Sequence, residues 1–427
     1  MKRKEFIAWN AALLGSLALP FKGRAAGPME AVGAAAEAGD EEALWETVRS
    51  QFILDPSWMY LNFAGLGACP LPVLNSLVEW NQAEERLPNV DHERPDWNKA
   101  KAKLARLLGK TCRTEDLAFI GCATEGIGII VNGLTLEAGD EVITSTHEHV
   151  AVNASLINRK QKDGIVIRTF EPDLERGLGN VDRIAKLING RTKLILISHV
   201  TCTTGQRFPE REIAALARDR GVLFALDGAQ AAVNVPFDVV DCGVDFYTAS
   251  THKWCMAPKR TGFLYIRQGL LEVLRPQTVG MSTNKRTDIW TQEMEFQPNP
   301  ERYEFGTEND ALFHALGTAC DFVQAIGPER VSARGRALAE RFYEGLKDIP
   351  GIERLSPAEE AYRSCIITFR MKNHPYEEVY DYLRKEKILA RRIQEGKLWA
   401  VRVSFFLNNR MEDVTRTLEL VDKLART

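Results

Sequence analysis

The chain has 427 residues, of which 45% are hydrophobic and 26% are charged, and its formal net charge is −3. This balance is typical of a soluble globular protein that is large enough for two lobes. No basic excess or basic run is present, so neither a nucleic acid nor an anionic membrane surface is an expected partner. Eight scattered cysteines without zinc-ligand spacing predict mostly reduced, buried thiols and no metal site.

The first 27 residues have the three-part layout of an export signal. Residues 1–7 form a basic start, residues 8–20 are largely apolar, and small residues stand at 25–27. Arg3–Lys4 is similar to a twin-arginine signal in which the second arginine is replaced by lysine. We therefore expect an exported, periplasmic protein; the alternative is a cytoplasmic protein that begins with an amphipathic helix. Residues 27–40 are rich in Ala, Gly and Glu and predict a flexible linker, so segment 1–40 is expected to be a signal-like segment with its linker.

From residue 117 onward, strand and helix patterns alternate regularly, which is typical of a parallel sheet with crossover helices. The apolar runs predicted as strands are Leu117–Ile120, Glu141–Thr144, Ile165–Phe170, Lys193–Ile197, Val222–Leu226, Phe246–Ala249 and Gly262–Ile266. The expected fold class is therefore α/β, with a seven-stranded, mainly parallel sheet between helices. After residue 275 the pattern changes to that of a smaller α+β domain. The expected division is an N-terminal arm over 41–75 that joins the small lobe, a large domain over 76–275 and a small domain over 276–427.

Two of these strands end in residues that suit one organic cofactor. Asp227 follows the run that ends at Leu226, and Lys253 follows the next strand within the sequence Ser-Thr-His-Lys. Pyridoxal phosphate needs a lysine that holds its aldehyde as a Schiff base and an acid that faces its ring nitrogen. The alternative is that Asp227 caps a helix and Lys253 is a solvated loop lysine.

These and several further motifs resemble the class V aminotransferase family of fold-type-I pyridoxal-phosphate enzymes. That family includes isopenicillin N epimerase-like proteins, cysteine desulfurases, selenocysteine lyases and kynureninases. The resemblance implies Lys253, Asp227 and His149 as the catalytic set, with the His149 ring stacked on the cofactor. The cofactor-binding residues that it implies are Ala123, Thr124, His149, Thr201, Asp227, Gln230, Ser250, His252 and Lys253.

The same resemblance implies a substrate side and a shared site. Asn62 and Ala64 lie in a Tyr-Leu-Asn-x-Ala stretch that lines the substrate side in the family, and Arg402 matches the arginine that grips the substrate α-carboxylate. Thr307 matches a threonine that reaches the phosphate of the partner subunit, which implies a homodimer. Simpler interpretations stay open at single positions: a turn after an edge strand at 60–67, a helix-capping threonine at 124, polar or metal-binding histidines at a strand end and a surface arginine at 402.

The shared residues do not separate transamination, racemisation and elimination, because all of these reactions begin with the same external aldimine. Segment 388–399 contains no cysteine, whereas a cysteine desulfurase needs a nucleophilic cysteine on that loop. Cys202 also stands near the position of a desulfurase asparagine. We therefore expect a pyridoxal-phosphate enzyme that acts on an amino acid and is isopenicillin N epimerase-like. The alternatives are a carbon–sulfur lyase without a loop persulfide cysteine and a cofactor-bound binding protein without catalysis.

Overall fold

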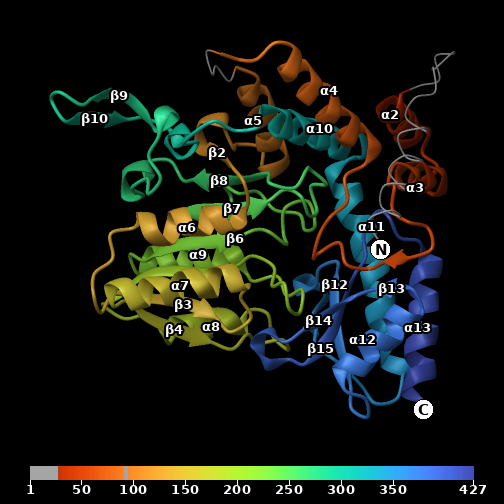
Figure 1. The fold of residues 1–427 in the computed structure, drawn as a ribbon. Coiled ribbons are helices and arrows are strands. Elements are labelled where there is room, and N and C mark those ends of the chain that lie inside the picture. The colour runs from red at the N-terminus through yellow and green to blue at the C-terminus, as the bar shows by residue number, and fades with distance from the viewer. Residues whose placement is uncertain (1–26, 91–94) are drawn as a thin grey trace, which may run out of the picture.

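The computed structural model describes residues 27–90 and 95–427 (Figure 1). The export-signal prediction falls on residues outside this part of the chain. Within it, no helix is long and apolar enough to cross a membrane, and no group of three His, Cys, Asp or Glu side chains is placed to hold a metal ion. All eight cysteines are free thiols, and six of them are buried.

A seven-stranded sheet forms the centre of the large domain, with the strand order β2-β8-β7-β6-β5-β3-β4 (Figure 1). Its strands are β2 (Leu117–Ile120), β3 (Glu141–Ser145), β4 (Val166–Phe170), β5 (Thr192–Ser198), β6 (Leu223–Asp227), β7 (Phe246–Ser250) and β8 (Gly262–Ile266). Only β8 runs against the other strands of this sheet. The prediction of a seven-stranded, mainly parallel sheet is therefore confirmed.

Both faces of the sheet are buried under helices, because alternate side chains of each strand point to opposite faces. On β5, Leu194 and Leu196 pack into one apolar core, whereas Ile195 and Ile197 pack into another. The first core is closed by α6 (Ala123–Gly133) and α7 (Val150–Asp163). The second is closed by α4 (Leu71–Arg86), α5 (Pro95–Leu108), α8 (Gly179–Ala185), α9 (Glu210–Asp219) and α10 (Asp310–Ile326). The continuous apolar runs of the sequence follow from this two-sided burial.

The C-terminal part of the chain forms a smaller four-stranded antiparallel sheet with helices beside it (Figure 1). The strands, in their order in the sheet, are β11 (Ile352–Arg354), β12 (Ile366–Met371), β15 (Ala400–Ser404) and β14 (Arg391–Ile393). The helices are α11 (Pro328–Gly345), α12 (Tyr376–Lys385) and α13 (Met411–Ala425). The sequence did not predict β11 and β14, because each has three residues and two of the three are charged.

The structure has a helix, α2 (Pro28–Ala38), where the composition predicted a flexible linker. Alanine favours the helix, Pro28 stands at its first turn, and Gly39 ends it in the left-handed conformation. Val32 is fully buried in an apolar cluster that also includes Leu44 of α3 (Glu41–Ser50). Residues 28–38 are therefore part of the folded core, which corrects the linker prediction.

Two short strand pairs complete the chain. Strand β1 (Met59–Tyr60) pairs in parallel with β13 (Ile388–Leu389) and so fixes the N-terminal arm on the C-terminal domain. Strands β9 (Asn284–Asp288) and β10 (Glu293–Phe296) form a hairpin that extends away from the body of the protein (Figure 1). The sequence analysis predicted neither pair.

Candidate active site

Polar side chains gather in one small cavity at the carboxyl ends of the parallel strands, which is where open parallel sheets bind ligands. Its lining comes from β5, β6 and β7, from the turns after them and from the starts of α6 and α7. The residues are Ala123, Thr124, Ile127, His149, Ala151, Ser198, Val200, Cys202, Asp227, Ala229, Gln230, Ser250 and Lys253. Most of the predicted cofactor residues are thus brought to one place.

Asp227 and Lys253 line this same cavity from neighbouring strands. Asp227 is the last residue of β6, is 5% exposed, and its Oδ1 accepts a hydrogen bond from the Ala229 N–H at 2.9 Å. Burial lowers the pKa of Lys253, an effect that nearby Asp227 opposes. A lysine with a lowered pKa is more often the neutral amine, which is the form that bonds to an aldehyde and accepts a proton.

The start of α6 forms a cradle for an anion. The Ala123 N–H donates to Ser250 Oγ at 2.8 Å, and Thr124 opens into the cavity beside it. His252 Nδ1 is buried and has no hydrogen-bond partner within the described residues. The positive end of a helix favours a phosphate, and the bond from Ala123 holds the Ser250 hydroxyl beside this helix start. The predicted phosphate ligand His252 does not line the cavity.

Gly126 explains why α6 lies so close to the sheet. A Cβ atom added at Gly126 would lie 1.9 Å from Thr248 Oγ1, a distance that no side chain tolerates. Because position 126 has no side chain, the first turn of the helix can press against β7. This contact holds the anion cradle next to Ser250 and therefore next to the end of the strand that leads to Lys253.

His149 lies where the stacking histidine was predicted, at the N-cap of α7. Its Nδ1 accepts a hydrogen bond from the Ala151 N–H at 3.2 Å, which fixes the ring. Burial lowers the pKa of His149, and Lys253 lowers it further, so the neutral ring is favoured. A neutral, oriented imidazole is suited to stacking on an aromatic cofactor.

Gln230, Thr201 and Thr307 have different surroundings. Gln230 lines the cavity, but its Nε2 donates to Ala64 O at 2.9 Å and its Oε1 accepts from Trp254 Nε1 at 2.8 Å. Thr201 is buried, and its hydroxyl bonds to Thr204 within its own turn, so it is absent from the cavity lining. Thr307 is exposed and also lies outside the lining.

The predicted substrate residues lie together on the N-terminal arm and β15. Arg402 is fully buried; its Nη2 donates to Asn62 Oδ1 at 2.8 Å and its Nη1 donates to Cys202 O at 2.6 Å. The Ala64 N–H donates to Ser404 Oγ at 3.0 Å. Burial and then Arg391 lower the pKa of Arg402 to about 9. The guanidinium therefore has neutral acceptors but no carboxylate of its own, which suits an incoming carboxylate.

The sequence analysis missed two charged residues at this site and the burial of a third. Arg391 forms an ion pair with Glu395, and the charges of both act on His149 and Cys202. Neither had a signal in the sequence, because β14 is too short to show alternation. Glu148 is fully buried beneath His149 and accepts hydrogen bonds from Ser145 and Ser198.

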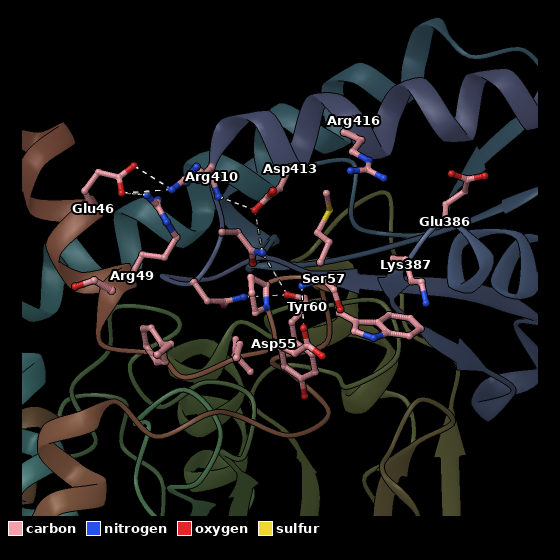
Figure 2. Close-up of a pocket in the computed structure, with 18 residues that line it drawn as sticks. Glu46, Arg49, Asp55, Ser57, Tyr60, Glu386, Lys387, Arg410, Asp413 and Arg416 are labelled. Atoms are coloured by element: carbon pink, nitrogen blue, oxygen red, sulfur yellow. Dashed lines mark hydrogen bonds and ion pairs between the residues drawn. The ribbon is translucent and has the colours of Figure 1, made fainter. Parts of the chain in front are cut away.

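A wider cleft, with a volume of about 550 Å³, lies elsewhere, between the N-terminal arm and α13 (Figure 2). Its charged lining residues largely pair with one another: Arg410 contacts Glu46, and its backbone N–H donates to Asp413. Lys387 lies over the Trp58 ring. None of the predicted cofactor residues lines this cleft, so the chemistry of the smaller cavity identifies the candidate active site.

Comparison with known proteins decides the family. The aminotransferase class-V family model matches residues 91–417. The chain belongs to this family. It is 30% identical over 348 residues to isopenicillin N epimerase of Amycolatopsis lactamdurans, covering 77% of this chain and 84% of that protein. It is 31% identical over 282 residues to cysteine desulfurase of Salmonella agona, covering 65% and 68%.

Solved structures show the same fold. The apo structure of cysteine desulfurase from Thermococcus onnurineus NA1 has a TM-score of 0.79 at 22% identity and covers 89% of this chain and 98% of its own. A complex of the cystine C-S lyase C-DES with its product cysteine persulfide has a TM-score of 0.79 at 23% identity and covers 86% and 98%. The predicted fold-type-I architecture is thereby confirmed.

Membership of the class-V aminotransferase family makes the protein a pyridoxal-phosphate enzyme, as the sequence predicted. The residues of the cavity fit that group. Lys253 would hold the aldehyde and Asp227 the ring nitrogen, and the start of α6 with Ser250 would hold the phosphate. His252, which the family resemblance adds to the phosphate site, lies outside the cavity lining. The bound cofactor supplies a ring that accepts electrons from a substrate carbon.

Proposed function

We propose that this enzyme moves a proton at the Cα atom of an amino acid, in the manner of an epimerase or aminotransferase, and that a loop thiolate takes no part. Arg402 binds the α-carboxylate and so orients the Cα–H bond. Lys253 then accepts the Cα proton as its neutral amine and, as the ammonium that results, holds or returns that proton. The observation that carries the proposal is that Lys253 and Asp227 line one cavity together with Cys202, whose carbonyl oxygen accepts a hydrogen bond from the buried guanidinium of Arg402 at 2.6 Å.

The cysteines support this choice over desulfuration. Cys202 is the one cysteine in the cavity lining, and it is 2% exposed. Burial raises the pKa of Cys202, which disfavours the nucleophilic thiolate. The relatives named cysteine desulfurase and the C-S lyase structure keep a carbon–sulfur lyase as the second candidate, since elimination also begins with removal of the Cα proton.

The test is exchange of the Cα hydrogen of amino acids in D₂O, followed by NMR on the cofactor-loaded protein. We expect exchange in the natural protein and in the Lys193→Ala control, whose lysine is exposed at the start of β5. Lys253→Ala should lose exchange by at least about 1,000-fold, the scale of a lost proton-transfer group. Absence of exchange with any amino acid would instead support a binding protein without catalysis.

The products of the same incubation distinguish epimerisation, transamination and carbon–sulfur lysis. Chiral chromatography detects epimerisation, a keto-acid assay detects transamination, and a sulfide assay with cysteine and cystine detects the lyase. We expect a changed configuration or a keto acid without sulfide. Sulfide release would support the second candidate and contradict our choice.

We also propose that the active unit is a homodimer. Thr307 is exposed and lies outside the cavity of its own protomer, as the family resemblance implies for a residue that serves the partner subunit. Light scattering should give twice the 47.9 kDa mass of one chain. A monomer that retains full Cα exchange would contradict this.

We propose further that the protein is exported. The support is the basic start, apolar stretch and small residues of segment 1–27. Cell fractionation with N-terminal sequencing should find a periplasmic protein that begins near residue 27. A full-length protein confined to the cytoplasm would contradict the proposal.

A further inference from the structure

Arg391 and Arg402 lie directly opposite each other on neighbouring strands. Their Cα atoms are partners in the antiparallel pairing of β14 with β15. Directly opposite residues project from the same face of a sheet with Cβ atoms about 4.5–5.5 Å apart, and like charges in this arrangement repel. Two arginines in such a pair are stable when anions lie close to both.

Among residues 27–90 and 95–427, one carboxylate, that of Glu395, contacts these two guanidinium groups. Arg391 pairs with Glu395, whose Oε1 contacts its Nη2. Arg402 bonds only to the neutral acceptors Asn62 Oδ1 and Cys202 O, and its Nε is buried without a partner. The pair of arginines therefore keeps one uncompensated positive charge before any substrate binds.

The loop that follows Arg391 packs beside a turn that lines the cavity. The loop after β14 turns at Gly396, where an added Cβ atom would lie 2.6 Å from the ring of His147, so this loop packs against the turn that carries His149. After burial, Arg402 and Arg391 both contribute to the lowered pKa of Lys253. At Cys202 the effect of Arg391 exceeds the opposing effect of Glu395. The charge of Arg391 thus acts on two residues that line the cavity.

The guanidinium of Arg391 has N–H groups that its contact with Glu395 does not use. A guanidinium presents five N–H groups in a planar fork, whereas the contact with Glu395 uses only Nη2. Glu395 orients the fork through this contact, and the Arg391 side chain remains 29% exposed. An oriented guanidinium with unused N–H groups is a good receptor for a second carboxylate.

We propose that Arg391 is a second anion subsite, which binds a side-chain carboxylate while Arg402 binds the α-carboxylate. The substrate class is then the acidic α-amino acids, whose two carboxylates span one short side chain. This inference rests on the proposed function, because it assigns the substrate of the same site. Arg391 determines specificity and takes no part in the proton transfer.

The experiment compares two probes of equal shape and different charge, succinate and succinamate. Both lack an amine and cannot react with the cofactor. Calorimetry on the cofactor-loaded protein should show that succinate binds at least about tenfold more tightly than succinamate, the value of one charge-assisted contact. Arg391→Gln should reduce this ratio to about twofold or less and leave succinamate binding unchanged.

Two variants serve as controls. Arg392→Gln removes the neighbouring exposed arginine, which lies over the Tyr380 ring, and should keep the full ratio. Glu395→Gln frees Arg391 from its carboxylate and should increase the ratio, which tests the subsite without removing the arginine. An Arg391→Gln variant that weakens both probes equally would make Arg391 part of the α-carboxylate site and overturn the proposal. So would an unchanged ratio in both Arg391→Gln and Glu395→Gln.

These outcomes are independent of those for the proposed function. Calorimetry measures the carboxylate subsite in the absence of chemistry, whereas Cα exchange measures the chemistry. A charge-dependent ratio without Cα exchange of any amino acid would support the subsite and contradict the proposed function. Cα exchange that prefers glutamine over glutamate in the natural protein would support the function and overturn the subsite.

Discussion

Replacing Glu148 by glutamine should make the protein more stable at neutral pH. The Glu148 carboxyl is fully buried and receives hydrogen bonds from the Ser145 hydroxyl at 2.5 Å and from the N–H and hydroxyl of Ser198 at 2.8 and 2.6 Å. Burial, helped by the nearby charge of Asp227, raises the pKa of Glu148 to about 7, although the serine donors oppose the rise. The folded state therefore favours the neutral acid.

The direction of the change in stability with pH follows from the pKa of Glu148 in the unfolded and folded states. In the unfolded chain a glutamate releases its proton near pH 4.5, whereas folded Glu148 keeps it until about pH 7. Between these values the folded state binds more protons, so stability falls as pH rises. The difference of about 2.5 pH units corresponds to about 3 kcal/mol in the free energy of unfolding. Glu148→Gln removes this loss, because an amide can keep the bonds to both serines and does not ionise.

Urea unfolding of the natural protein and of Glu148→Gln from pH 4.5 to 8 measures the effect. The two curves should lie close together at pH 4.5 and separate by up to about 3 kcal/mol at pH 8, with the variant more stable. Glu141→Gln is the matched control, because Arg168 lowers the pKa of Glu141 to about 2 and this variant should lose stability near neutral pH. A difference between Glu148→Gln and the natural protein that does not change with pH would refute the reasoning.

Three other substitutions test how the site is built. Arg402→Met should change the free energy of unfolding in urea by less than about 2 kcal/mol, because the loss of two hydrogen bonds is offset by removal of a buried charge. The affinity for a carboxylate, measured by calorimetry, should nevertheless fall at least about 100-fold. Gly126→Ala should cost about 1–3 kcal/mol by pushing α6 away from Thr248, whereas the control Gly128→Ala, with no atom closer than 4.0 Å, should gain up to about 1 kcal/mol. Phe63→Ala should cost about 3–5 kcal/mol in the same urea assay and also weaken carboxylate binding. A stable Phe63→Ala protein with unchanged affinity would contradict the packing argument.

The parts of the site that were predictable are those that lie at the ends of long apolar strands. Asp227 ends β6 and Lys253 follows β7, and these strands are neighbours both in sequence and in the sheet, so the order of the runs alone indicated that their ends meet. The turns after β2 and β3 were found in the same way. Periodicity and the carboxyl-end rule for parallel sheets were sufficient there, because every step is local.

The parts that were not predictable depend on contacts between distant segments. Arg391 lies opposite Arg402 only because β14 pairs with β15, and no pattern in three residues with two arginines predicts that pairing. The helix α2 has the composition of a linker, and only its contact with the cluster around Val32 distinguishes it from one. The burial of Glu148 likewise follows from β5 lying beside β3, which brings Ser198 to its carboxylate, and a sequence motif does not contain that information.

Three aromatic rings that contact one another support the segments that carry the charged groups of the site. Phe63, Trp254 and Phe406 touch one another, with ring centroids 4.8 to 6.0 Å apart. Each ring lies next to a functional residue in the chain: Phe63 follows Asn62, Trp254 follows Lys253, and Phe406 lies just beyond the strand that carries Arg402. The N-terminal arm, the turn that carries Lys253 and strand β15, which carries Arg402, therefore cannot move independently.

Because of this coupling, the packing of the three rings directly affects the proton transfer. A lysine that takes a proton from Cα must stay in register with the arginine that orients Cα, and displacements of about 1 Å are enough to slow such reactions strongly. The arm reinforces the register from outside, because a Cβ atom added at Gly67 would lie 2.4 Å from the carbonyl oxygens of His252 and Lys253. Close packing of the arm on the lysine turn thus positions the amine, and loosening Phe63 should disturb carboxylate binding and proton transfer together.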